Sequence, residues 1–111
     1  MKTSNFRNYG TGRGAVSISL RPPPWYRGGE YKKLAPSWDL LKAYMTSKIN
    51  RCEYTERYLK EVLYGLNARE VVDELGIDSV LLCYEKPGEF CHRRIVANWI
   101  ELALGIKVEE L

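Results

Sequence analysis

The sequence predicts a small α/β protein, a three-layer domain in which a short, mainly parallel sheet of three to four strands is flanked by helices. Residues 15–20, AVSISL, alternate apolar and polar side chains, as a strand does. Residues 79–84, SVLLCY, form a nearly continuous apolar run, which is typical of a strand covered on both faces. Segments of helical periodicity separate these strands, so we expect parallel pairing with right-handed crossovers.

Two further strands complete the expected sheet. Residues 3–6, TSNF, are interpreted as a short first strand, and residues 106–108 as a short last one. A glycine-rich connection, residues 10–14, follows the first strand. Its GxGxG pattern precedes a strand instead of following one, which is the wrong context for a dinucleotide-binding fingerprint. The 111 residues suit a single domain spanning residues 1–111.

Four helices are predicted from apolar periodicity and from capping residues. The first begins after Ser37, a favourable N-cap. The second is the amphipathic stripe between residues 54 and 66. A short third helix occupies residues 67–76, where an asparagine suits the start and a glycine suits the end. The fourth covers residues 89–104 and ends at a glycine.

The composition is that of a globular protein, with 45% hydrophobic and 28% charged residues. A net charge of +3 is compatible with an anionic ligand but does not indicate nucleic acid by itself. The three cysteines are few and odd in number, which argues against a disulfide framework and for a reducing, cytoplasmic setting. No apolar run approaches the roughly 18 residues of a membrane span, so we expect no membrane association.

Polar residues follow both well-defined strands at the point where each strand ends. Arg21 follows the first of them and Glu85 the second, and a helix begins shortly afterwards at residues 89–91. The carboxyl ends of parallel strands form the usual ligand-binding edge of an open sheet, and a helix start there favours an anion. We therefore predict a site at this edge. The alternative is that Arg21 and Glu85 form a structural ion pair.

The start of the last helix carries the most reactive side chains. A helical wheel directs His92 inward with the apolar face, puts Cys91 and Arg93 on its flanks, and turns Arg94 towards solvent. His92 is then either a general acid or base, or a hydrogen-bonded core residue. Cys91 is either a nucleophile, whose thiol pKa the helix start and its basic neighbours lower, or a small buried residue.

Neither a metal nor another cofactor is predicted. A structural zinc site needs four ligands with paired spacing, whereas Cys83, Cys91 and His92 supply at most three, and Cys83 belongs to a strand interior. An aromatic residue, Trp25, lies in the loop that follows Arg21. It is interpreted either as a surface that stacks on a base or as a cover for the edge of the sheet.

The segment LLCYEKPGEFCHRRIVANW resembles the signature of the domain of unknown function 488 (DUF488) family, a strand ending in C-x-E, a short loop with proline, and C-H-R at the start of a helix. The upstream run SISLRPPPWYRGGEYKKLAP and the opening TSNF resemble one subgroup, whose members are similar to proteins of bacteria and their phages. The resemblance implies a small α/β domain without settled biochemistry, in a family whose members are suspected of acting on nucleotides or nucleic acids. By position, its motif residues are Arg21, Cys83, Glu85, Cys91, His92 and Arg93.

Together these observations favour a site that binds or acts on the phosphate or glycosidic centre of a nucleotide or nucleic acid. The candidate catalytic residues are Glu85, Cys91 and His92, and the candidate ligand-binding residues are Arg21, Trp25 and Arg93. The expected partner is a phosphate-bearing small molecule or a nucleic acid. The alternatives are a non-catalytic module that binds a nucleotide ligand or a protein, and a purely structural polar network. The sequence does not decide whether the protein is an enzyme.

Overall fold

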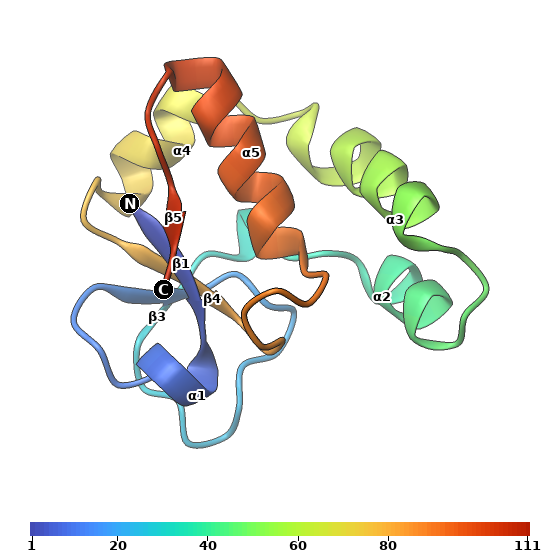
Figure 1. Cartoon of the computed structure of the whole chain (residues 1–111), viewed down its shortest axis with the longest axis horizontal. Helices are drawn as coiled ribbons and strands as arrows, with labels where there is room; N and C mark the ends of the chain where they lie inside the picture. The colour runs from blue at the N-terminus through green and yellow to red at the C-terminus, as the bar shows by residue number, and fades with distance from the viewer.

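A sheet of five parallel strands lies at the centre of the computed structural model, which describes residues 1–111 (Figure 1). The strand order is β3-β2-β4-β1-β5, and neighbouring strands all run in the same direction. The strands are β1 (Lys2–Asn5), β2 (Ala15–Ser17), β3 (Gly29–Glu30), β4 (Val80–Cys83) and β5 (Glu109–Glu110). The predicted α/β class with a parallel sheet is therefore confirmed.

The number of strands and two of their positions differ from the prediction. β3 has only two residues and lies in a stretch predicted to be loop, because a pair of residues is too short to show any periodicity. The last strand is β5 at Glu109–Glu110 instead of residues 106–108. β1 pairs with β4 in regular parallel register from Lys2 opposite Val80 onwards, despite the short glycine-rich connection that follows it.

Five α-helices surround the sheet: α1 (Phe6–Tyr9), α2 (Trp38–Met45), α3 (Arg51–Tyr58), α4 (Ala68–Leu75) and α5 (His92–Leu104). A 3-10 turn at Lys32–Leu34 precedes α2, and a π-helical turn at Leu59–Leu63 prolongs α3. The predicted cap of α2 is confirmed, because Ser37 Oγ accepts a hydrogen bond from the Leu40 N–H at 3.1 Å. None of these helices combines the length and the apolar character that crossing a bilayer requires.

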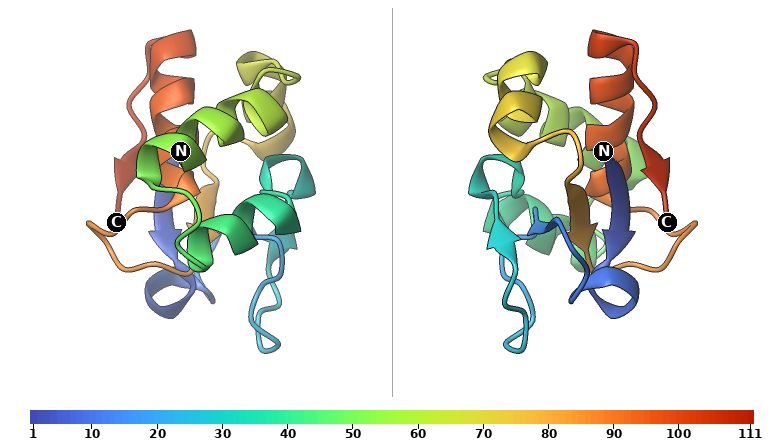
Figure 2. Two further views of the ribbon diagram at one scale, coloured as in Figure 1. Left: turned by 90° about the vertical axis from the view of Figure 1, so that its right-hand side faces the viewer. Right: turned by 90° about the vertical axis from the view of Figure 1, so that its left-hand side faces the viewer.

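Alternating residues of β4 contribute to apolar clusters on both faces of the sheet. Leu81 belongs to the larger apolar cluster, which α3, α4 and α5 complete with Tyr58, Val71 and Val96. Leu82 points the other way, into a smaller cluster with Phe6 of α1. α2 and α3 form a helical pair next to α5, away from β1 and β5 (Figures 1 and 2). This pair supplies the second wall of the site described next.

Candidate functional site

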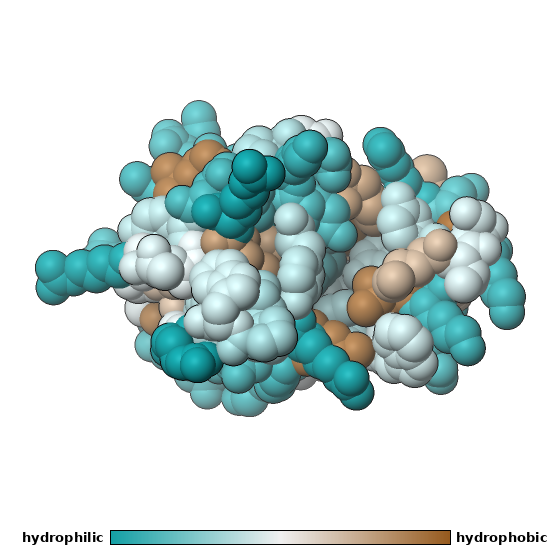
Figure 3. Space-filling model, turned by 90° about the horizontal axis from the view of Figure 1, so that it is seen from below, coloured by the Kyte–Doolittle hydropathy of each residue, from teal (hydrophilic) through white to brown (hydrophobic).

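A cavity of about 1070 Å³ lies where β2 and β4 end, and α2 with the start of α3 closes its other side. Its lining residues are Ser19, Leu20, Arg21, Pro36, Trp38, Leu41, Tyr44, Met45, Ser47, Lys48, Ile49, Asn50, Glu53, Cys83, Tyr84, Glu85 and His92. Figure 3 views the molecule from this end and shows a hollow between the larger, sheet-bearing part and the smaller part on the right. The cavity therefore lies at the carboxyl edge of the sheet, the usual position of a ligand in an open α/β fold.

Three of the six predicted site residues line this cavity together. Arg21 comes from the chain after β2, Glu85 from the chain after β4, and His92 from the first turn of α5. No ion pair joins Arg21 to Glu85, since neither residue takes part in the salt bridges of the structure. Both charged groups are therefore free to contact a ligand.

Hydrogen bonds fix the two strand ends that carry Arg21 and Glu85. The Tyr84 hydroxyl donates to the Arg21 carbonyl at 2.6 Å, and the Asn5 side-chain amide donates to the Glu85 carbonyl at 3.2 Å. The same Asn5 side chain caps α1 by accepting from the Asn8 N–H at 2.8 Å. The backbone at Glu85 is thus tied to β1, while its half-buried carboxylate has no hydrogen-bond partner within the chain.

His92 is buried and neutral. Its Nε2 lies 2.7 Å from the Ile18 carbonyl oxygen, and a carbonyl can only accept, so Nε2 carries the proton. Burial lowers the His92 pKa to about 4, the hydrogen bond to Ile18 opposes this, and the Arg93 charge lowers it further. The Nδ1 lone pair therefore stays free, 3.8 Å from the sulfur of Cys91. In this state His92 accepts a hydrogen bond or binds a metal but does not act as an acid.

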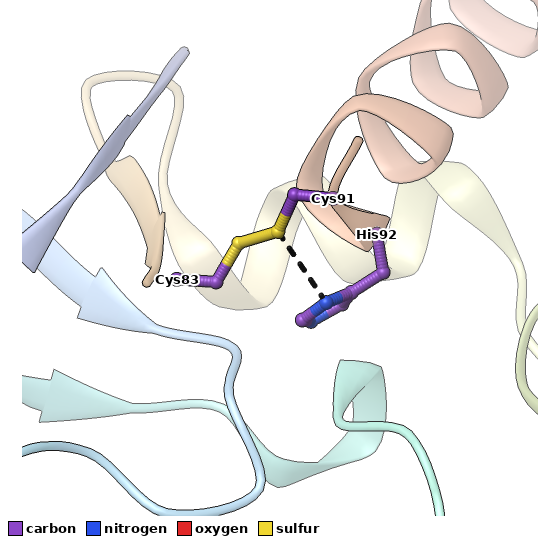
Figure 4. Close-up of side chains that lie close together, drawn as sticks. All are labelled: Cys83, Cys91 and His92. Atoms are coloured by element: carbon purple, nitrogen blue, oxygen red, sulfur yellow. Dashed lines mark hydrogen bonds between the residues drawn. A yellow bond between two sulfur atoms is a disulfide. The ribbon is translucent and has the colours of Figure 1, made fainter. Parts of the chain in front are cut away.

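A disulfide joins Cys83, at the end of β4, to Cys91, the residue before α5 (Figure 4). The cysteine count, which argues against a disulfide framework, did not predict this single pairing. It was missed because the turn at Pro87 and Gly88 brings together two residues eight positions apart, which composition does not reveal. In this oxidised form Cys91 has no thiol to act as a nucleophile. Cys52 is free and exposed.

Arg93 does not reach the cavity. Its side chain has no exposed surface, and its guanidinium forms a salt bridge with Glu110 of β5, with 2.8 Å between Nη2 and Oε2. Its Nη1 also donates to the Cys83 sulfur at 3.1 Å. The anion that Arg93 binds is therefore a carboxylate of the protein itself, and its predicted contact with a ligand finds no support in this geometry.

The expectation that Arg94 is solvated is wrong. Its side chain is half-buried, and its Nη1 donates to Thr3 Oγ1 at 2.9 Å and to the Val108 carbonyl at 3.0 Å. The helical-wheel prediction took the sheet as the only neighbour of α5. In the structure the chain after α5 returns beside β1 and covers the flank of the helix that carries Arg94.

Trp25 lies apart from the cavity. Its ring packs against Gly10, at the end of α1, closely enough that a Cβ at position 10 would clash with it. Half of the Trp25 surface remains exposed. This position agrees with its interpretation as a cover at one side of the sheet, and its predicted stacking on a base finds no support in the lining of the cavity.

Sequence reasoning missed the wall formed by α2 and α3. Tyr44 and Met45 belong to an apolar stripe that predicts core packing, yet Met45 is 66% exposed and both residues line the cavity. Trp38, the first residue of α2, lines it too and is 56% exposed. The available signal for this wall was a tryptophan at the start of an eight-residue helix, because so short a helix cannot bury residues on every side.

Residues 24–104 match the family model of the active DUF488-N3 subclade. The match includes β3, the helices from α2 to α5, and the segment from Glu85 to Arg93. It begins just after Arg21, so this residue is outside the matched region. No curated protein and no solved structure gives a significant match to the chain.

Proposed function

Because the chain belongs to the DUF488 family, we propose that its cavity binds a nucleotide, or one nucleotide unit of a nucleic acid, and exposes the phosphate or glycosidic bond to Glu85. The observation that carries this proposal is the cavity at the carboxyl edge of the sheet, in which cationic, aromatic and acidic side chains face one space. Its volume of about 1070 Å³ is just above the range for small-molecule sites, roughly 300–1000 Å³.

The lining offers a separate contact for each part of a nucleotide. Trp38, Tyr44 and Tyr84 present aromatic surface, on which a base gains about 1–3 kcal/mol by stacking. Arg21 and Lys48 supply positive charge for a phosphate. The apolar residues between them exclude water from the ribose and the base. This combination suits a nucleotide better than a bare inorganic anion, which would leave the aromatic residues without a contact.

Glu85 is the residue that we expect to carry any chemistry. Its carboxylate is unpaired within the chain and lines the cavity, so it can accept a proton from an attacking water or stabilise positive charge that develops at a glycosidic carbon. His92, neutral and fixed by Ile18, supplies an acceptor at the cavity wall. The description of the matched subclade as active favours an enzyme over a binding module.

Isothermal titration with nucleosides, nucleoside monophosphates, short single-stranded oligonucleotides and inorganic phosphate tests the binding step. We expect monophosphates or oligonucleotides to bind, and Arg21→Ala to weaken them by about tenfold, the loss of one charge-assisted contact. Arg69→Ala removes an exposed arginine of α4 that is outside the cavity, and should leave the affinity unchanged. Absence of binding at millimolar ligand, or equal effects of the two substitutions, would overturn the proposal.

The Glu85→Gln substitution separates an enzyme from a non-catalytic binding module. If the protein is an enzyme, this variant should keep its affinity for the ligand and lose turnover by a factor on the order of 10²–10⁴, the usual contribution of a general acid or base. If the variant keeps the full biological effect while Arg21→Ala removes it, the protein is a binding module. Product analysis by mass spectrometry identifies the bond that is broken.

A further inference from the structure

Three side-chain atoms that bind soft metals meet at the junction of β4 and α5. They are the sulfurs of Cys83 and Cys91 and a ring nitrogen of His92, which lie within 4.8 Å of one another. All three residues are buried, and Figure 4 shows the imidazole turned towards the two sulfurs. Cys83 and His92 also line the cavity, so this cluster opens on the candidate ligand site.

The orientation of His92 suits a metal ligand. Its Nε2–H donates to the Ile18 carbonyl at 2.7 Å, which leaves the Nδ1 lone pair facing the Cys91 sulfur at 3.8 Å. Metal-bound histidines almost always donate their other ring N–H to a carbonyl or carboxylate in this way.

A second contact holds the sulfur of Cys83 in position. Arg93 Nη1 lies 3.1 Å from it, and the salt bridge to Glu110 holds the guanidinium in place. A sulfur bound to a metal can still accept this hydrogen bond, as the outer-shell partners of metal ligands do. Arg93 therefore acts as a positioning residue for the sulfur, a role that explains why a fully buried arginine points at a cysteine.

We propose that the reduced chain binds a zinc-type divalent cation through the Cys83 and Cys91 thiolates and His92 Nδ1, with the fourth coordination position open to the cavity. A thiol or phosphine reductant supplies the two electrons, and two protons complete the two thiols. The metal then displaces one proton from each thiol. Oxidation to the disulfide and binding of the metal are mutually exclusive, because both use the same two sulfurs.

The distances are compatible with this exchange. In a tetrahedral zinc site with Zn–S bonds of about 2.3 Å and Zn–N bonds of about 2.0–2.1 Å, sulfur and nitrogen lie about 3.6 Å apart. The Cys91 sulfur and His92 Nδ1 are already 3.8 Å apart. The two bonded sulfurs must separate to about 3.8 Å. The Cys83 sulfur, which lies within 4.8 Å of a His92 ring nitrogen, must come to about 3.6 Å from Nδ1. Rotation of the cysteine side chains can accomplish both changes.

Three protein ligands with one open position are typical of catalytic zinc sites, whereas structural sites use four. The spacing argument that excluded a structural zinc site is therefore compatible with this one. Glu85 follows Cys83 by two positions and lines the same cavity, where it could accept a proton from a water bound to the metal. The binding of the metal is independent of the proposed function, and only the use of the open position rests on it.

Optical titration with Co²⁺ tests the site without any nucleotide. The chain is reduced with a phosphine, freed of metal and titrated with Co²⁺. We expect thiolate-to-cobalt charge-transfer absorption and intense visible bands that saturate at one cobalt per chain and disappear when Zn²⁺ is added. The oxidised, folded wild-type chain should give neither signal. A reduced chain without cobalt absorption, or an oxidised chain that shows it, would overturn the proposal.

Variants assign the ligands. Cys83→Ser, Cys91→Ser and His92→Gln should each weaken Co²⁺ binding by more than about 100-fold, beyond the roughly 10–100-fold that the loss of an outer-shell partner typically costs. Cys52→Ser, which removes the exposed free cysteine, should leave the spectrum intact. If Cys52→Ser abolished the spectrum or His92→Gln preserved it, the assignment would be wrong. If a variant unfolds, the comparison of the oxidised with the reduced wild type tests the site in its place.

The two proposals can fail separately. Arg21→Ala should keep the cobalt spectrum of the wild type, because Arg21 does not belong to the cluster. Nucleotide titration of the oxidised, metal-free wild type measures the cavity alone. If the chain binds cobalt but no nucleotide, the metal site is supported and the proposed function is wrong. If it binds a nucleotide but no cobalt, the proposed function is supported and the metal site is wrong.

Discussion

The guanidinium of Arg93 in α5 donates three hydrogen bonds of 2.8 to 3.2 Å to the carboxylate of Glu110 in β5. The Arg93 side chain has no exposed surface, and the Glu110 side chain keeps 19%. The pair therefore joins the last helix to the last strand in a largely dehydrated setting. Because Arg93 Nη1 also touches the Cys83 sulfur, this salt bridge connects the C-terminal strand with the cysteine cluster.

Glu110→Gln should destabilise the chain by about 3 kcal/mol, because it leaves the buried Arg93 charge without a counterion. Urea denaturation followed by circular dichroism measures the change. The neighbouring Glu109 is exposed, so Glu109→Gln should change the stability by less than about 0.5 kcal/mol. Equal losses in the two variants would show that the salt bridge contributes nothing specific.

The same carboxylate predicts how stability depends on pH. Burial tends to raise the pKa of Glu110, but hydrogen bonds from Arg93 and Thr3, with the charges of Arg93 and Arg94, outweigh it and hold the pKa below 4.5. A carboxylate whose pKa is lower in the folded state stabilises the fold above its ordinary pKa. This contribution is lost as the pH falls through the folded value.

The wild type should therefore lose more stability than Glu110→Gln as the pH falls from about 5, since the variant has no carboxylate to protonate. Urea midpoints measured at several acidic pH values give the two curves. They should converge in acid, where Glu110 of the wild type becomes protonated as well. Parallel curves over the whole range would contradict the assignment of this pH dependence to Glu110.

Local periodicity predicted the parts of this structure that depend on neighbours in sequence. The covered strand β4 follows from the apolar run at residues 79–84, and the inward direction of His92 follows from its spacing to Val96. The meeting of Arg21, Glu85 and His92 follows from a general rule, that the carboxyl ends of parallel strands share one edge. No knowledge of the particular fold was needed.

The parts of the structure that could not be predicted depend on how segments that are distant in sequence are placed in space. Arg93 and Glu110 are 17 positions apart, and Glu110 belongs to a two-residue strand with no periodic signal. The partner of Arg93 therefore could not be identified, and neither could the cover over Arg94. The second wall of the cavity depends on how α2 and α3 stand against the sheet. A helical stripe indicates that one face is apolar but does not say whether core or cavity lies against it.

Reduction of the disulfide should destabilise the chain by about 2–3 kcal/mol, the loop-closure entropy for two cysteines eight positions apart. Thermal unfolding with and without a phosphine reductant, in the presence of a chelator that removes metals, measures this loss. The double variant Cys83→Ser/Cys91→Ser should match the reduced wild type and show no response to reductant, while Cys52→Ser should respond as the wild type does. A wild type that is insensitive to reductant would mean that the cysteines are not paired in solution.

Asn5→Ala should affect both stability and the candidate site. The Asn5 side chain caps α1 through the Asn8 N–H, and loss of such a cap typically costs about 1 kcal/mol. It also donates to the Glu85 carbonyl at 3.2 Å, so its removal frees the backbone that positions Glu85 at the cavity. We therefore expect nucleotide affinity to fall by about three- to fivefold, the equivalent of one modest hydrogen bond.

Asn67→Ala is the matched control for this experiment. The Asn67 side chain caps α4 in the same manner, by accepting from the Glu70 N–H at 3.1 Å, and it does not line the cavity. Asn5→Ala should lose more stability in urea than Asn67→Ala, because Asn5 is buried and also loses its bond to the Glu85 carbonyl, and only Asn5→Ala should weaken the binding of a nucleotide in a titration. If both variants bound it equally well, the Asn5 contact would not position Glu85 for binding, and the α1 cap would be its whole contribution.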